Sequence, residues 1–243
     1  PKSQDITAYY TQDLSPNDID ILEATFQYVH GPPKTLFTLK NNNFKVIDIS
    51  GSLSQSSYSN DISLNDIISV MVGTNVTTLG YAAFSQATNL TSVTIPDSVI
   101  TIEEFAFESS GLTSVTIPAS VTSIVEGAFS APKLTSVTFE PNSQLTSIGE
   151  QAFQLASSLT SITIPPLVTS IGSDAFLDSS LNTVYMTEAT SGQLKLPTWG
   201  NYSISPPVGP DGQQPDNVLD VYGLNNYSFF GATVNIYNPT PAL

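Results

Sequence analysis

Four similar segments follow one another between Leu90 and Ser180: LTSVTIPDSVITIEEFAFESSG (90–111), LTSVTIPASVTSIVEGAFSAPK (112–133), LTSVTFEPNSQLTSIGEQAFQLASS (134–158) and LTSITIPPLVTSIGSDAFLDSS (159–180). They are 22, 22, 25 and 22 residues long, and Leu181 opens a further copy. A fixed period in the twenties is typical of solenoids, in which one coil cannot bury its apolar face alone and stacked coils bury it together. The sequence therefore predicts a stack of coils in this region.

Apolar residues recur at fixed positions of each copy, counted from the leading leucine as position 0. Position 3 holds Val93, Val115, Val137 and Ile162, and position 5 holds Ile95, Ile117, Phe139 and Ile164. Because Ser and Thr alternate with them, this pattern predicts a half-buried strand. In three copies a proline follows and ends the strand, since proline cannot donate to a ladder. A second pair of apolar residues, such as Val99 and Ile102, predicts another short strand.

An Ala-Phe pair comes next in every copy: Ala106-Phe107, Ala128-Phe129, Ala152-Phe153 and Ala175-Phe176. Acidic residues before the pair suit the first turn of a short helix. We expect each phenylalanine to fill the interior of its coil and to stack on the phenylalanine of the next coil. The three extra residues of the third copy fall around residues 141–144 and after Phe153, in expected turns, where insertions cost little.

This repeat resembles the BspA-like class of leucine-rich repeats, which occurs in bacterial surface proteins, protist surface proteins and some large-virus proteins. The resemblance covers roughly residues 67–188. It implies a leucine-rich-repeat solenoid, an α/β repeat that is predominantly β, with a parallel β-sheet, about two short strands and one short helical turn per 22–25-residue coil. Members often have a cysteine three residues after the phenylalanine, where this chain has Ala87, Ser110, Pro132, Ala156 and Ser179. Small residues fit the same interior turn, so the fold is not in doubt. Function is implied only loosely, as adhesion or partner binding.

The chain divides into three predicted parts. Residues 1–43 are expected to form an N-terminal cap, with a helix at about 16–29 that begins at Ser15-Pro16, followed by a strand. Residues 44–188 are expected to form the solenoid, with weaker copies beginning at Phe44 and Ile67. Residues 35–40 and 44–50 alternate like strands about three asparagines, which favours a hairpin or the edge of a first coil. Residues 189–243 are expected to hold an insertion loop and a terminal coil or cap, with a last strand around Val234 and Ile236.

Composition excludes several classes of partner. The 243 residues include six lysines, no arginine and 21 acidic residues, for a net charge of −15. Nucleic acids and anionic membrane surfaces require clustered basic residues, so neither is an expected partner. The chain has no cysteine and therefore no disulfide or thiol chemistry. No apolar run reaches the 18 residues of a membrane span, so we expect no membrane insertion.

The most distinctive expected surface consists of the hydroxyl residues at positions 2 and 4, which we call the hydroxyl face: Ser92, Thr94, Ser114, Thr116, Ser136, Thr138, Ser161 and Thr163. In a stacked sheet they form two parallel rows, about 4.8 Å apart along the stack. One interpretation is that threonine is simply a good exposed strand residue. A second is a contact face for a protein or glycan partner, and a third, minor one is an array that orders water and binds ice.

Catalytic and metal-binding chemistry have little support in the sequence. The single histidine, His30, follows the expected cap helix, and no nucleophile or acid partner is arranged around it. The acids Glu103, Glu104 and Glu108, and the acids Asp174 and Asp178, lie beside the Ala-Phe pairs, where a role in turns or helix starts is favoured. Acid groups at residues 13–20 and 211–220 lack calcium-site spacing. We expect no catalytic residues, no metal and no cofactor.

Two further sets of residues are candidate contact or modification sites. Aromatic residues of the C-terminal part, above all Trp199, Tyr202 and Tyr222, are candidate partner contacts, with Tyr227 and Phe229 beside them. Sequons for N-glycosylation occur at Asn75, Asn89, Asn201 and Asn226, a number expected by chance in a chain with 16 asparagines and 60 serines and threonines. They permit glycosylation if the protein is secreted from a eukaryotic or virus-infected cell.

The sequence thus favours a non-enzymatic, extracellular or cell-surface protein that binds a host surface protein, or a glycan, through the solenoid. The alternative is a structural component of a virion or cell-envelope surface that packs on copies of itself or on a coat protein. The two hypotheses differ in oligomeric state, since an adhesion module is expected to be a monomer.

Overall fold

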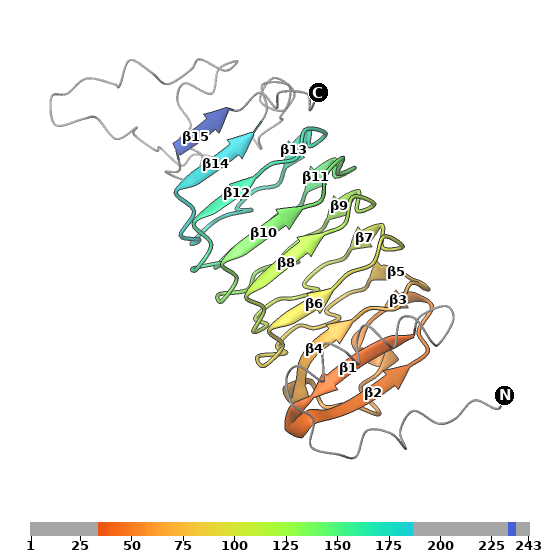
Figure 1. Ribbon diagram of the computed structural model, residues 1–243. Helices are drawn as coiled ribbons and strands as arrows, with labels where there is room; N and C mark the ends of the chain where they lie inside the picture. The colour runs from red at the N-terminus through yellow and green to blue at the C-terminus, as the bar shows by residue number, and fades with distance from the viewer. Residues whose placement is uncertain (1–33, 187–232, 237–243) are drawn as a thin grey trace, which may run out of the picture.

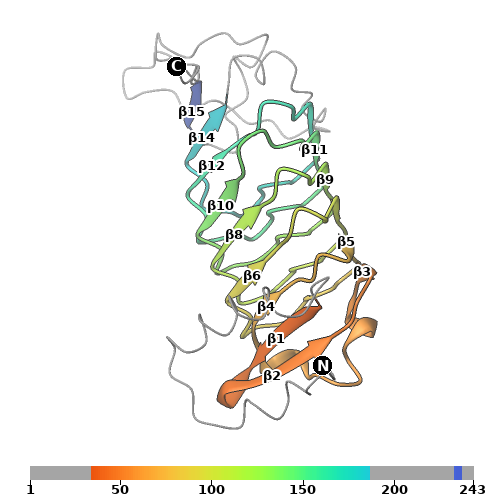
Figure 2. The ribbon, with the colours of Figure 1, turned by 45° about the vertical axis from the view of Figure 1, so that its right-hand side comes forward.

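The computed structural model describes residues 34–186 and the strand at residues 233–236. Its coils stack into a solenoid with one strand of each coil in a front row and one in a back row (Figure 1). The front row contains β4 (Ile67–Met71), β6 (Ser92–Thr94), β8 (Ser114–Ile117), β10 (Ser136–Phe139), β12 (Ser161–Thr163), β14 (Thr183–Met186) and β15 (Thr233–Ile236). The back row contains β3 (Gly51–Leu53), β5 (Val76–Leu79), β7 (Thr101–Ile102), β9 (Ser123–Ile124), β11 (Ser147–Ile148) and β13 (Ser170–Ile171). Figure 2 shows the two rows on opposite sides of the stack.

The paired strands within each row are parallel, and most of their pairs match like residues with like. In the front row Val115 lies opposite Val137, and in the back row Ile124 lies opposite Ile148. The inward side chains of successive coils therefore meet, while the intervening serines and threonines face away from the core. The predicted solenoid and its two strands per coil are confirmed.

The Ala-Phe segments form a third column of contacts between coils, which we call the turn column. They are hydrogen-bonded turns and not the short helical turns that the acidic residues suggested. The reason is that alternate N–H groups bond to the next coil, as when Phe107 N donates to Ala128 O (2.8 Å) and Phe129 N donates to Ala152 O (2.7 Å). Residues just before the pair have positive φ, for example Gln151 (54°), which turns these N–H groups outward.

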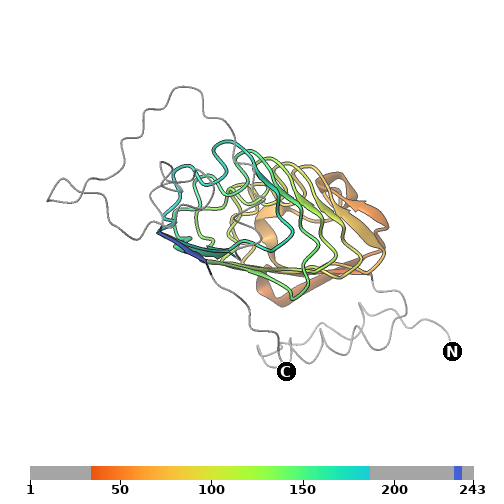
Figure 3. The same ribbon diagram turned by 90° about the horizontal axis from the view of Figure 1, so that it is seen from above.

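A column of aromatic rings fills the interior. It runs Phe37, Tyr58, Phe84, Phe107, Phe129, Phe153 and Phe176, and neighbouring ring centroids are 5.0 to 5.9 Å apart. Leucine, isoleucine, valine and alanine side chains surround the rings and form one continuous core from the hairpin to β14. The view from above shows the coils behind one another around this core (Figure 3). The predicted phenylalanine column is therefore present, and it is longer than predicted.

The N-terminal end departs from the repeat. β1 (Thr35–Leu39) and β2 (Asn43–Ile47) form an antiparallel hairpin through a 3-10 turn, η2 (Lys40–Asn42), and β1 also pairs antiparallel with β4. The residues around Phe44, expected to open a weak copy, therefore supply a hairpin strand. Only β3 occupies a repeat position, with Leu53 opposite Leu79. The Ser-rich stretch after it contains two further 3-10 turns, η3 (Gln55–Ser57) and η4 (Leu64–Asp66).

Tyr58 closes the N-terminal end of the interior. Its ring takes the place of a phenylalanine in the aromatic column, and its hydroxyl donates a hydrogen bond to the Ala83 carbonyl of the turn column. The side-chain amide of Gln55 donates a hydrogen bond to a second carbonyl of the turn column, that of Ser85 (3.2 Å). Side chains thus satisfy two carbonyls that a preceding coil would otherwise cover.

Two predicted parts lie outside the described residues: the helix at about 16–29 and the insertion loop from residue 189. Of the C-terminal part, the structure describes β15, which pairs in parallel with β14. β15 therefore occupies the front-row place of one further coil.

Candidate functional site

The hydroxyl face lies along β6, β8, β10 and β12 in the middle of the front row (Figure 1). All eight of its residues are exposed, while the residue between each pair, such as Val115 or Ile162, is buried or half-buried. The strands place them there because successive side chains alternate across a strand. The predicted separation of inward hydrocarbon from outward hydroxyls is therefore observed.

Register aligns the hydroxyls in two rows. Ser114 lies opposite Ser136 and Thr116 opposite Thr138. The serine row continues beyond the predicted residues, to Ser69 in β4 and Thr183 in β14. The same positions of the outer copies in the sequence would have identified these two residues.

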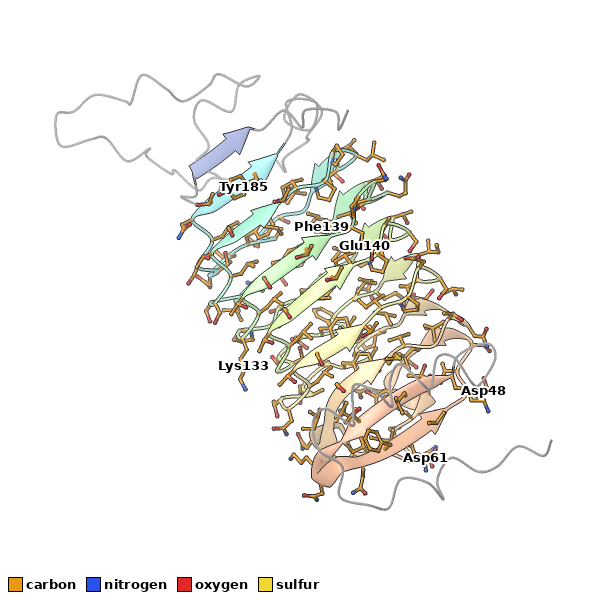
Figure 4. The ribbon with its side chains drawn as sticks, viewed as in Figure 1. Asp48, Asp61, Lys133, Phe139, Glu140 and Tyr185 are labelled. Atoms are coloured by element: carbon orange, nitrogen blue, oxygen red, sulfur yellow. The ribbon has the colours of Figure 1, made fainter. Side chains whose placement is uncertain are left out.

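The row of threonines at position 4 ends in other residue types on both sides. Met71 replaces threonine in β4, and Tyr185, which is 41% exposed, replaces it in β14. Figure 4 shows Tyr185 at the C-terminal end of the row. The face is thus a hydroxyl strip with one exposed aromatic ring at one end.

The hydroxyls of the face differ in their partners from three threonines at position 1 of the repeat. Thr91, Thr113 and Thr135, at position 1, each donate to a backbone carbonyl of the preceding coil, at 3.3, 3.2 and 2.8 Å. Across the described part of the chain, none of the eight hydroxyls of the face has a hydrogen-bond partner within the protein. These three hydroxyls at position 1 therefore stabilise the stack, and the eight hydroxyls of the face remain available to a ligand or to water.

The hydroxyl face carries no charge, although the chain is strongly acidic. β6, β8, β10 and β12 contain only Ser, Thr, Val, Ile and Phe. The charged residues closest in sequence to β10 are Lys133 and Glu140, which Figure 4 shows at opposite margins of the face. Glu140 turns back to accept a hydrogen bond from Ala119 N (3.2 Å). A partner can therefore approach the strip without desolvating an ion.

The acidic residues of the turn column form hydrogen bonds within the fold. Glu103 Oε2 accepts from Tyr81 N (2.9 Å), and Glu108 Oε2 accepts from Ser85 Oγ (3.0 Å). Within residues 34–186 no group of three or more acidic or histidine side chains is placed to hold a metal ion. Nor does this part contain a helix with the length and apolar composition of a membrane span. His30 and the acid groups at residues 13–20 and 211–220 lie outside the described residues.

Two of the four sequons can be assessed. Asn89 Nδ2 donates to Asn65 O (2.8 Å), and the following Leu90 is fully buried, so this sequon is built into the stack. Asn75 is half-buried, and its side-chain amide donates no hydrogen bond to a backbone carbonyl of the described residues. The hydroxyl of the same sequon, Thr77 Oγ1, donates to Gly51 O (3.4 Å). Of these two, Asn75 is the more available acceptor. Asn201 and Asn226, and the candidate contacts Trp199, Tyr202, Tyr222, Tyr227 and Phe229, lie outside the described residues.

Comparison with known families and structures identifies the repeat. The family model described as a BspA type leucine rich repeat region matches residues 77–192 in six copies. No curated protein matches the chain.

Three solved structures are similar to parts of the chain. The pneumococcal vaccine antigen PcpA is 25% identical, with a TM-score of 0.51 over 61% of this chain and 38% of its own. A leucine-rich repeat protein from Bacteroides capillosus is 39% identical, with a TM-score of 0.33 over 36% of this chain and 63% of its own. A T. pallidum leucine-rich repeat protein is 22% identical, with a TM-score of 0.37 over 57% and 52%. This chain therefore covers less than two thirds of each of these proteins. Together with the two parallel strand rows, the six matched copies show that residues 77–192 form a repeat region of the BspA type.

Proposed function

We propose that this protein is a non-catalytic extracellular or cell-surface protein that binds a protein or glycan partner through the hydroxyl face. The observation that supports the proposal most is the set of eight exposed hydroxyls without an intramolecular partner on an uncharged strip. Leucine-rich repeat proteins generally mediate protein interactions, and the BspA-like family includes many surface adhesion proteins. Solenoids present extended binding surfaces of this kind.

The dimensions of the strip indicate how it would bind. Four strands about 4.8 Å apart and about 10 Å of each strand give roughly 190 Å² of contact surface. A stable protein interface buries about 800 Å² on each partner. We therefore expect a single hydroxyl face to bind weakly, and its flanking turns or several copies of the protein to strengthen the contact.

Lysine substitutions on the two rows test the proposal with a matched control. Thr116→Lys and Thr138→Lys place charge in the centre of the hydroxyl face, whereas Ser123→Lys and Ser147→Lys make the same charge change at paired positions of the back row. The full chain and both double variants are applied to arrays of neutral and charged glycans and of surface proteins. Loss of binding in the front-row variant alone supports the proposal. Equal loss in both variants, or no loss in either, contradicts it.

The alternative function, a structural component that packs on copies of itself, is favoured by the same lack of charge. In a chain of net charge −15, the hydroxyl face is a place where two copies can meet without repulsion between carboxylates. Sedimentation velocity separates the two functions. A monomer that binds array ligands supports recognition, whereas a concentration-dependent oligomer that Thr116→Lys dissociates supports assembly.

A further inference from the structure

Two aromatic side chains lie together on the outside of the turn column, away from the hydroxyl face. Tyr81 is 61% exposed, the highest value among the large apolar side chains of residues 34–186. Its ring meets that of Phe105 edge to face, with centroids 6.1 Å apart and planes at 88°. Phe105 is half-buried, but its side chain does not pack against the hydrophobic core. We call this pair the aromatic corner.

Phe105 is poorly suited to its backbone position. Its φ is 57°, a left-handed conformation that bulky residues seldom adopt. The equivalent positions of other coils also have positive φ but hold Ala82, Gly127, Gln151 and Asp174. The coil therefore requires the conformation but does not require a large apolar residue there.

The next coil accommodates the Phe105 ring. A Cβ on Gly127 would lie 2.5 Å from Phe105 Cδ1 and 2.6 Å from Cε1, so the ring lies directly over this glycine. A side chain at residue 127 would displace the ring. The Phe105 ring is thus held between Gly127 and the ring of Tyr81, on the surface and not in the interior.

One carboxylate lies at the aromatic corner, and the backbones of two further acidic residues lie beside it. Glu103 Oε2 accepts from the backbone N–H of Tyr81 (2.9 Å), which places this carboxylate at the tyrosine. Backbone bonds from Ala82 N to Glu104 O and from Phe105 N to Glu126 O, both 2.9 Å, place the backbones of two more acidic residues beside the backbone of the corner. The lysines of residues 34–186 lie elsewhere in the sequence: Lys34, Lys40 and Lys45 in the hairpin region and Lys133 before β10.

We propose that the aromatic corner docks an arginine-bearing segment of a protein partner. A guanidinium group is planar and weakly hydrated, so it stacks on an aromatic ring while it pairs with a neighbouring carboxylate. The Glu103 carboxylate and the neighbouring acidic residues supply the charge complementarity, and the exposed Tyr81 ring supplies the surface that distinguishes arginine from any other cation. This site goes beyond the proposed function of the hydroxyl face and does not depend on it.

The test uses the full chain and two defined probes, hexa-arginine and hexa-lysine peptides, titrated calorimetrically at about 0.15 M salt, where charges more than about 8 Å apart are largely screened. Tyr81→Ser removes the exposed ring, and Phe105→Gly removes the other while placing the best-suited residue at a left-handed position. Leu155→Gly is the matched control, because Leu155 is also exposed and has a φ of 58°. Thermal unfolding of each variant confirms that it is folded.

We expect hexa-arginine to bind more tightly than hexa-lysine, and Tyr81→Ser and Phe105→Gly each to weaken hexa-arginine binding by about two- to fivefold or more, the range for an exposed ring. Leu155→Gly should leave binding unchanged. A matched pair of charge variants adds a second readout: Glu104→Gln should weaken binding more than Asp178→Asn, which makes the same charge change farther along the turn column. The proposal is overturned if hexa-arginine does not bind, or if both peptides bind equally and no aromatic variant matters. The latter result would show only the general attraction of a chain with a net charge of −15.

Discussion

Truncating the central ring of the aromatic column, by Phe129→Ala, is expected to destabilise the protein strongly. Phe129 is fully buried and lies between Phe107 and Phe153, at centroid distances of 5.2 and 5.6 Å and with planes within 8° of parallel. The neighbouring coils do not collapse into the space, because backbone bonds fix them to this coil.

The magnitude follows from the contacts that are lost. Burial of a phenylalanine side chain contributes about 1.5–3 kcal/mol, and each of two aromatic contacts contributes about 0.5–1.5 kcal/mol beyond it. The sum, about 2.5–6 kcal/mol, brackets the range of about 3–5 kcal/mol measured for phenylalanine truncations in cores. We therefore expect a loss of about 3–5 kcal/mol.

Urea unfolding followed by circular dichroism measures this loss, with Thr116→Ala as control. Thr116 is exposed and without a hydrogen-bond partner, so its truncation should cost less than about 0.5 kcal/mol. Because each coil contacts only its neighbours, the Phe129→Ala variant is also expected to unfold less cooperatively than the parent. Equal destabilisation by the two substitutions would refute the assignment of inner and outer faces.

Three further outcomes are expected. Burial raises the pKa of the Tyr58 phenol above its usual value of about 10. Above a pH of about 10 the unfolded chain releases a proton that the folded chain retains, so the free energy of unfolding should fall as pH rises, by up to about 1.4 kcal/mol per pH unit. Urea unfolding of the parent and of Tyr58→Phe from pH 8 to 11 measures this fall, which should be smaller in Tyr58→Phe. Gly172→Ala would place a Cβ 2.3 Å from Glu150 N and 2.5 Å from Gly149 C, so its thermal unfolding should show a loss of about 1–3 kcal/mol, and an unchanged stability would contradict the close approach of these coils. Thr113→Val removes a hydroxyl bonded to Thr91 O and should cost about 0.5–1.5 kcal/mol in urea unfolding, whereas Thr116→Val removes an unpartnered one and should be close to neutral.

The periodic part of the fold was predictable from the sequence because each copy repeats the same pattern of apolar and polar residues. Apolar residues at positions 3 and 5 specify which side of a strand is buried, and identical copies can stack only in register, as Val115 and Val137 do. The phenylalanine column follows from the same repetition. These features depend on alternation and period, which a sequence displays directly.

The turn column was mistaken for short helices because its hydrogen bonds join coils and not neighbours in the chain. The acids before each Ala-Phe pair are compatible with either arrangement. Only the bonds from one coil to the next, such as Phe107 N to Ala128 O, distinguish the two, and they have no local sequence signal. Tyr58 was missed for a related reason, since it precedes Phe84 by 26 residues whereas Phe84 precedes Phe107 by 23.

In the candidate site, the repeat pattern alone does not determine which hydroxyls are bonded within the protein and which are not. Thr113 and Thr116 lie three residues apart in the same copy and are both exposed. Nothing in the sequence distinguishes their roles. The structure separates them: Thr113 stands at the corner where the chain enters β8 and reaches the Thr91 carbonyl, while Thr116 stands within the strand, whose backbone groups are already paired with β10. The corner hydroxyls of Thr91, Thr113 and Thr135 bond to the preceding coil, whereas the strand hydroxyls of β6, β8, β10 and β12 have no partner within the described part of the protein. This surplus, repeated in register across an uncharged strip, is the reason why we propose the front row and not the corner as the surface for a partner.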